Sequence, residues 1–197
     1  MTDEQPGKII GLTGPIAAGK DEVAKILAKC GAYIIDADQI AHQLYSYPSP
    51  VWQELVKTFG SKILMRGGKI NRRKLGEIVF SDKKSLKKIN EIVHPYLKEA
   101  IIQIVESGKQ VDSRIVINAA VLKEIGLLNY VDEVWVVIAS KENRLKRLVK
   151  SGLSKTEALK RINAQAAQKD YLKQADVVIR NDGTLKQLRD QVEDLLS

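Results

Sequence analysis

Residues 9–23, IIGLTGPIAAGKDEV, combine residue types and a spacing that can hold a phosphate group. Gly14, Gly19 and Lys20 match the pattern G-x-x-x-x-G-K, between a strand-like apolar run and a helical pattern, the context this motif requires. Glycines let backbone N–H groups surround an anion, while the helix N-terminus and the Lys20 ammonium add positive potential. The alternative is a glycine-rich turn with no ligand. The predicted phosphate-binding loop consists of Gly14, Pro15, Ile16, Ala17, Ala18, Gly19 and Lys20.

Asp21 departs from this motif, in which a Ser or Thr hydroxyl follows the lysine and binds Mg²⁺. A carboxylate is a good ligand for a hard cation, but it repels phosphates. It is tolerable only if the metal lies between them or another negative charge has been removed nearby. Alternatively, an acidic residue near a helix N-terminus is stabilised by the helix dipole and has no metal role.

Two further carboxylates, Asp36 and Asp38, follow the strand-like run at 32–35. They project to the same side if the extended chain continues, and the ends of parallel strands border the ligand crevice of an open sheet. One acid could hold a metal-bound water while the other accepts the proton of an attacking hydroxyl. The alternative is that Asp38 only caps the following helix, but the phosphate loop favours the catalytic interpretation.

Alternating strand and helix patterns predict how these residues are positioned. The strand-like runs, at 8–13, 32–35, 114–121, 133–139 and 176–179, are separated by helical patterns, which predicts an α/β fold with a five-stranded parallel sheet. The first helix, at 19–30, should end at Gly31, and Ser154 with Glu157 and Thr184 with Gln187 predict capping boxes. Residues 39–113 are too long for one crossover, so we expect a helical subdomain there, with a turn at 66–69.

Composition limits the class of protein and its partners. The net charge of +8 favours a nucleic acid or a phosphorylated metabolite, but aromatic residues are only 5% of the chain and no basic tail stands apart. No run approaches the roughly 20 apolar residues of a membrane span, and residues 1–8 lack the features of a secretory signal. We expect a cytoplasmic protein that binds neither nucleic acid nor membrane, as a monomer or small homo-oligomer. The lone Cys30 is expected to be a small buried side chain.

Several segments together resemble the dephospho-coenzyme A kinase family, whose members use ATP to phosphorylate the ribose 3′-hydroxyl of dephospho-CoA. They are IIGLTGPIAAGKDEVAKIL, IIDADQIAHQLY, NRRKLGEIVFSDKKSLKKINEIVHPYL, VLKE, RINAQ and ADVVIRNDG, in family order over 9–183. The resemblance implies one three-layer P-loop kinase domain over 1–197, with a helical CoA-binding insert at 45–104 and a small helical lid at 141–165. It implies ATP and Mg²⁺ as cofactors and dephospho-CoA as the substrate.

The resemblance also implies roles for individual residues. Asp38 would activate the ribose hydroxyl, and Asp36 would act beside it toward the Mg²⁺ waters and the substrate. Asn181 and Gly183 fall in the segment that borders the adenine. Lid arginines would stabilise the transferring phosphoryl group. The candidates are Arg144, Arg147 and Arg161, of which Arg161 lies in the best match to the family, and ordinary surface charge is the alternative.

Three residues in the predicted insert are candidates for substrate binding. The guanidinium groups of Arg72 and Arg73 could hold the substrate's pyrophosphate bidentately, although a solvated helix face explains such a pair equally well. His94, which precedes Pro95, is either a substrate contact or a packed residue at a helix break.

The chain departs from the family pattern at Asp21, and also at Asn118, Ala120, Lys123 and Arg180. An acidic residue usually ends the third strand, where Asn118 stands here. A carboxylate lost at 118 and gained at 21 keeps the local negative charge constant, so we hypothesise that a Mg²⁺ ligand has been relocated. The alternatives are another small-molecule P-loop kinase, a catalytically weakened nucleotide-binding protein and, from net charge alone, a nucleic-acid binder.

Overall fold

The computed structural model describes residues 7–108 and 114–196. The chain forms two compact units, one made of Met1–Ile35 with Val105–Ser197 and the other of Asp36–Ile104. Parts of the predicted N-terminal segment 1–8 and of the predicted helical segment 39–113 lie outside the described residues. Within those residues, no helix is both long enough and apolar enough to cross a membrane.

The first unit is built on the predicted five-stranded parallel sheet, with strand order β2-β3-β1-β4-β5. The strands are β1 (Ile9–Thr13), β2 (Tyr33–Asp36), β3 (Ile115–Asn118), β4 (Glu133–Ile138) and β5 (Val177–Arg180). All residues of the central β1 are buried, which matches its continuous apolar sequence. The strand expected at 114–121 already ends at Asn118, because the chain then enters a series of turns.

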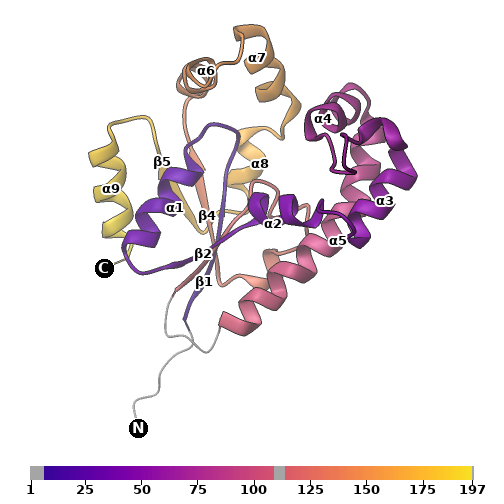
Figure 1. Cartoon of the computed structure of the whole chain (residues 1–197). Coiled ribbons are helices and arrows are strands. Elements are labelled where there is room, and N and C mark those ends of the chain that lie inside the picture. Colours follow the sequence, from indigo (N-terminus) through magenta and orange to yellow (C-terminus); the bar gives the residue numbers. More distant parts are fainter. Residues whose placement is uncertain (1–6, 109–113, 197) are drawn as a thin grey trace. The chain divides into compact units, whose positions relative to one another are not determined.

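Two helices lie side by side against the sheet, α1 (Lys20–Lys29) and α9 (Leu185–Asp194) (Figure 1). The apolar face of α1 packs on the sheet, and Gly31, with φ of 89°, turns the chain back as predicted. Cys30 is exposed, so the expectation of a buried thiol is wrong. Cys30 is the C-cap of α1, where the helix ends, so helical periodicity no longer directs its side chain to the core.

The segment between β4 and β5 is helical, and it consists of α6 (Lys141–Lys150), α7 (Lys155–Ala164) and α8 (Gln168–Leu172). Helix α7 begins with the predicted capping box of Ser154 and Glu157, and α9 begins with that of Thr184 and Gln187. Leu148, Ala158 and Ile162 form a small apolar cluster between α6 and α7, against which Ile16 and Ala17 of the predicted phosphate loop pack. This cluster joins the two helices to the loop. A short 3₁₀ helix, η2 (Leu128–Tyr130), precedes β4.

The second unit is helical, as expected. It contains α2 (Ala37–Leu44), α3 (Pro50–Phe59), η1 (Ser61–Ile63), α4 (Arg72–Ser81) and most of α5 (Lys83–Gly108). The predicted turn near 66–69 is present, closed by the hydrogen bond from Met65 N to Lys69 O.

The long helix α5 contains Pro95 in its interior, so of the two alternatives left open for His94, the one that places it at a helix break is wrong. A proline costs one backbone hydrogen bond, but side chains at four-residue spacing are buried along the whole helix. These are Ile89, Val93, Leu97, Ile101 and Val105. The apolar stripe continues on both sides of the proline and keeps the two halves in one helix.

Candidate active site

The phosphate loop connects β1 to α1, as its sequence predicts, and close packing requires its two glycines. A Cβ atom on Gly14, whose φ is 153°, would lie 2.2 Å from the carbonyl oxygen of Val137. One on Gly19, whose φ is 100°, would lie 1.9 Å from Nδ2 of Asn181. A side chain at Gly14 would displace the backbone of Val137, and one at Gly19 would displace the side chain of Asn181. The loop therefore has the backbone freedom and the following helix N-terminus that an anion site needs.

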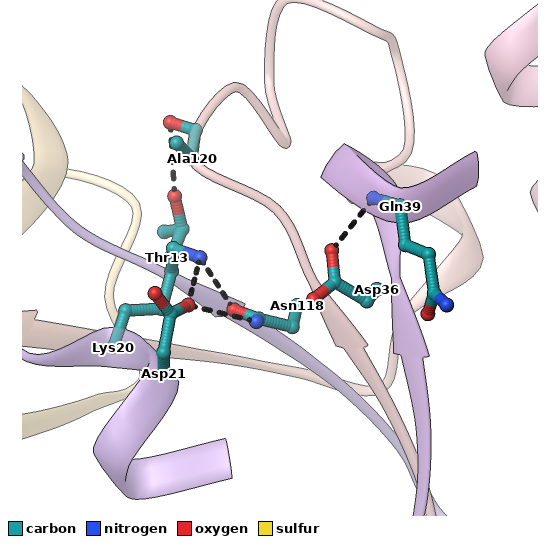
Figure 2. Close-up of polar contacts among 7 residues, drawn as sticks. All are labelled: Thr13, Lys20, Asp21, Asp36, Gln39, Asn118 and Ala120. Carbon is teal, nitrogen blue, oxygen red and sulfur yellow. Dashed lines mark hydrogen bonds and ion pairs between the residues drawn. The ribbon is translucent and has the colours of Figure 1, made fainter. Parts of the chain in front are cut away.

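Lys20, Asp21 and Asn118 form a closed polar network at the start of α1 (Figure 2). Nζ of Lys20 lies 2.6 Å from Oδ1 of Asn118 and 3.0 Å from Oδ1 of Asp21, and Nδ2 of Asn118 donates to the same Asp21 oxygen at 3.1 Å. The Lys20 side chain is only 11% exposed, whereas that of Asp21 is 76% exposed. The two residues that depart from the family pattern are thus in direct contact.

The environment of Asp21 favours its ionised form. Partial burial opposes ionisation, but the hydrogen bond from Asn118 and the positive charge of Lys20 outweigh it and hold the pKa of Asp21 below its usual value. Lys20 and Asn118 both donate to Oδ1 of Asp21, and the third contact joins Lys20 to Asn118. Oδ2 of Asp21 therefore takes no part in the network. Asp21 can therefore present a charged oxygen to a cation.

A buried hydroxyl ties the loop strand to the segment that follows β3. Oγ1 of Thr13, which is 1% exposed, donates to the carbonyl oxygen of Ala120 at 3.4 Å (Figure 2). The contact uses the backbone of residue 120, so it does not depend on the side chain there. The departure from the family pattern at Ala120 therefore leaves this connection in place.

The backbone N–H and C=O groups of Ile16 are both hydrogen-bonded to side chains of the predicted lid. Nε of Arg144 donates to the Ile16 carbonyl oxygen at 2.8 Å, and the Ile16 amide donates to Oε1 of Gln165 at 2.6 Å. Burial lowers the pKa of the Arg144 guanidinium, and its Nη2 is a buried donor without a hydrogen-bond partner among the described residues. Sequence reasoning missed Gln165 as a loop contact, although it ends the quoted segment RINAQ.

The other predicted lid and adenine residues are placed differently. Arg147 donates to carbonyl oxygens of the phosphate loop, whereas Arg161 is exposed on α7. Asn181, which is 8% exposed, donates from Nδ2 to the carbonyl oxygen of Ala18 at 2.8 Å. The Asn181 side chain thus supports the loop. The sequence predicted only that Asn181 lies in the segment beside the adenine. Gly183 lies between β5 and α9.

Asp36 and Asp38 do not continue an extended strand, so the expected projection to one side is wrong. The helix α2 begins at Ala37, directly after Asp36, and the Asp36 side chain accepts a hydrogen bond from Gln39 N at 3.0 Å (Figure 2). Asp36 is therefore the cap that sequence reasoning assigned to Asp38. Asp38 lies in the first turn of α2 and is exposed.

The second unit groups Asp38 with basic and aromatic side chains. A terminal nitrogen of Arg72 contacts Nε2 of His42. Burial raises the pKa of Tyr45, while the charge of Arg72 lowers it and that of Asp38 raises it, so both charges act on this tyrosine. Neither His42 nor Tyr45 was a sequence candidate. His42 lies in α2 and Tyr45 directly follows it. Their position in the helical segment that begins with Asp36 and Asp38 was the sequence signal that could have identified them.

The remaining substrate candidates lie apart from this group. Arg73 pairs with Glu77 at 3.1 Å, one helical turn along α4, and its side chain is 89% exposed. This is the solvated helix face that the sequence left open for one of the two arginines. His94 lies half-buried on α5.

Comparisons with known proteins agree with these features. A family model described as dephospho-CoA kinase matches residues 8–187. The dephospho-CoA kinase of Carboxydothermus hydrogenoformans is 43% identical over 190 residues, which cover 95% of this chain and 92% of that protein. The solved dephospho-CoA kinase of Campylobacter jejuni has a TM-score of 0.72 and 27% identity, and the match covers 95% of this chain and 94% of that one.

A more distant match extends the likeness of fold alone. The shikimate kinase of Bacteroides thetaiotaomicron has a TM-score of 0.57 at 15% identity, and the match covers 96% of this chain and 98% of that one. The P-loop kinase fold is thus shared beyond the family. With the phosphate loop formed on β1 and α1, and with a family match over nearly its full length, this chain belongs to the dephospho-CoA kinase family.

Proposed function

We propose that this chain transfers the γ-phosphoryl group of ATP to the ribose 3′-hydroxyl of dephospho-CoA, giving coenzyme A and ADP. The observation that carries the proposal is the phosphate loop, with the largely enclosed Lys20 side chain at the start of α1, in a member of this family. In the reaction, the bond between the 3′-oxygen and the γ-phosphorus forms and the bond from the γ-phosphorus to the β,γ-bridging oxygen breaks. The hydroxyl proton is transferred to a carboxylate.

Binding of the ATP phosphates is the task of the loop amides and Lys20. Phosphoryl transfer needs positioning and the stabilisation of charge on the phosphoryl oxygens more than covalent chemistry by the protein. Arg144 suits this task, because its unpartnered Nη2 lies on a side chain already fixed to the loop through Ile16. The exposed Arg161 is the second candidate for the same charge. Asn181 and Gly183 are proposed to border the adenine.

The donors present also fit Mg²⁺. Asp21 and Asp36 would hold the ion, directly or through its water molecules, since carboxylate oxygens are preferred ligands of this cation. Asp21 favours its ionised form, and its Oδ2 makes none of the network's hydrogen bonds, so it offers both the charge and an oxygen atom. When bound, Mg²⁺ supplies neutralisation of phosphate charge.

We assign the binding of dephospho-CoA to the second unit. We assign Asp38 as the base that takes the ribose hydroxyl proton, because it is an exposed carboxylate on the first turn of α2. Arg72 is the preferred contact for the pyrophosphate, because it belongs to the group of His42, Tyr45 and Asp38. Asp36 and His94 remain proposed substrate contacts, and Arg73 is the weaker candidate. The protein is proposed to act in the cytoplasm.

The direct test is turnover with the purified protein, ATP, Mg²⁺ and dephospho-CoA, followed by mass detection of a product heavier by one phosphoryl group. The analogue without the 3′-hydroxyl should give no product, and Lys20→Met should abolish turnover while the fold, followed by circular dichroism, persists. Binding of ATP without transfer would favour a weakened nucleotide-binding protein. Transfer to a nucleoside or sugar but not to dephospho-CoA would favour another small-molecule kinase.

A further inference from the structure

Three consecutive carbonyl oxygens of the phosphate loop accept hydrogen bonds from side chains outside the loop. Arg144 donates to Ile16 O at 2.8 Å, and Nη1 of Arg147 donates to Ala17 O at 3.0 Å and to Ala18 O at 2.9 Å. A loop that directs its N–H groups toward an anion must direct its carbonyl groups elsewhere, and these need donors where water is excluded.

Ala17 is the strained point of this loop. Its φ is 59°, and it is the only residue other than glycine with a positive φ among those the structure describes. An L-residue avoids this region because its Cβ approaches a carbonyl oxygen, and such strain persists only where the surroundings impose it. Here the surroundings are the hydrogen bond from Arg147 and the apolar cluster of α6 and α7.

Both terminal nitrogens of the Arg147 guanidinium take part in this support. Besides the two bonds from Nη1, its Nη2 donates to the carbonyl oxygen of Asn181 at 2.6 Å. Nδ2 of Asn181 in turn donates to Ala18 O at 2.8 Å. One planar fork thus connects the phosphate loop to the end of β5, and both of its terminal nitrogens are bonded to backbone carbonyl oxygens. A lysine at 147 could not form this fork.

We infer that Arg147 is a positioning residue, which holds Ala17 in its left-handed conformation and so keeps the loop amides ready for a triphosphate. Arg147 therefore differs in role from Arg144 and Arg161, which remain the arginines proposed for the phosphoryl charge. The inference rests on the proposed function only in taking the anion to be the triphosphate tail of ATP.

The test combines Arg147→Lys with Ala17→Gly, because glycine adopts the left-handed region without strain. Binding of ATP and of inorganic triphosphate is measured by calorimetry. Arg147→Lys should weaken both affinities about tenfold, while kcat at saturating ATP stays within about twofold, since the fork is lost but the charge remains. Ala17→Gly alone is measured as the reference for the double variant. The double variant should recover about threefold or more of the lost affinity, because glycine removes the strain that the fork offsets.

A matched control comes from the same helix. Lys146 pairs with Glu142 on the exposed side of α6, so Lys146→Met removes a positive charge without touching the loop. It should change triphosphate affinity less than about twofold. Similar losses in Lys146→Met and Arg147→Lys, a large fall in kcat for Arg147→Lys, or no recovery in the double variant would overturn the inference.

The inference and the proposed function can fail separately. Triphosphate affinity needs no acceptor, so the expected pattern in the variants together with no coenzyme A formation would leave the role of Arg147 intact and remove the function. Coenzyme A formation without that pattern would do the reverse. Thermal melting of every variant detects loss of the fold itself.

Discussion

Nζ of Lys20 lies 2.6 Å from Oδ1 of Asn118, which is 98 positions away in the chain. The same amide donates from Nδ2 to Asp21, so one neutral side chain bridges the loop lysine and the acid beside it. An aspartate at 118 would lose this donor and add a second negative charge. The two departures from the family pattern are therefore physically coupled.

This coupling leads to a prediction on metal binding. Asp21→Thr should weaken the affinity of the ATP complex for divalent metal about tenfold, because a neutral hydroxyl replaces a carboxylate ligand. The double variant Asp21→Thr with Asn118→Asp should regain most of the affinity, because it again has a carboxylate, now at position 118, beside Lys20. Electron paramagnetic resonance of Mn²⁺ measures this without turnover, and Mg²⁺ dependence of the rate provides the second readout. Unchanged metal affinity and rate in Asp21→Thr would remove the idea of a relocated ligand.

A second prediction concerns pH and the free energy of unfolding. The pKa of Asp21 is lower in the folded than in the unfolded chain, so its contribution is present above about pH 4 and is lost as pH falls through the folded value. Relative to Asp21→Asn, the original protein should be more stable at pH 6, by about 0.5 kcal/mol or less because the side chain is 76% exposed. Urea unfolding at pH 6 and pH 3 measures the difference. A difference that grows toward pH 3 would contradict the expected sign.

Two glycines with similar φ but different surroundings give a third prediction. Gly19→Ala should cost about 3 kcal/mol or more and abolish ATP binding, since its Cβ would meet Asn181 in a tightly packed loop. Gly31 also has a positive φ, of 89°, but a Cβ there has open space, so Gly31→Ala should cost only about 1 kcal/mol and leave ATP affinity unchanged. Urea unfolding and calorimetry measure both. Equal effects would show that φ, and not the contact with Asn181, determines the requirement for glycine.

Adjacent arginines on α4 give a fourth prediction. Arg72→Lys should raise the KM for dephospho-CoA about tenfold, because Arg72 belongs to the group near Asp38 and lysine lacks the planar fork. Arg73→Lys should change it less than about twofold, because Arg73 is an exposed partner of Glu77. Steady-state kinetics with saturating ATP compares them. A larger effect of Arg73→Lys would show that Arg73, and not Arg72, contacts the pyrophosphate.

Features whose causes are local could be predicted from the amino-acid sequence. The loop between β1 and α1, the capping boxes at 154 and 184 and the end of α1 at Gly31 each depend on a few neighbouring residues, and each is predicted by the sequence and present in the structure. The parallel sheet followed from the alternation of strands and helices, because parallel strands need long crossovers. Family motifs added the expected roles of the site residues.

Features that depend on competing interactions or on residues distant in sequence are visible only in the folded chain. Helix α5 continues through Pro95 because buried contacts along its length outweigh one lost hydrogen bond, and Asp36 caps α2 because the helix begins directly after it. The contact of Lys20 with Asn118, the hold of Gln165 on Ile16 and the fork of Arg147 join segments about 100 to 150 residues apart in sequence. Spacing along a chain carries no information about such pairs, because only folding brings their atoms within hydrogen-bond distance.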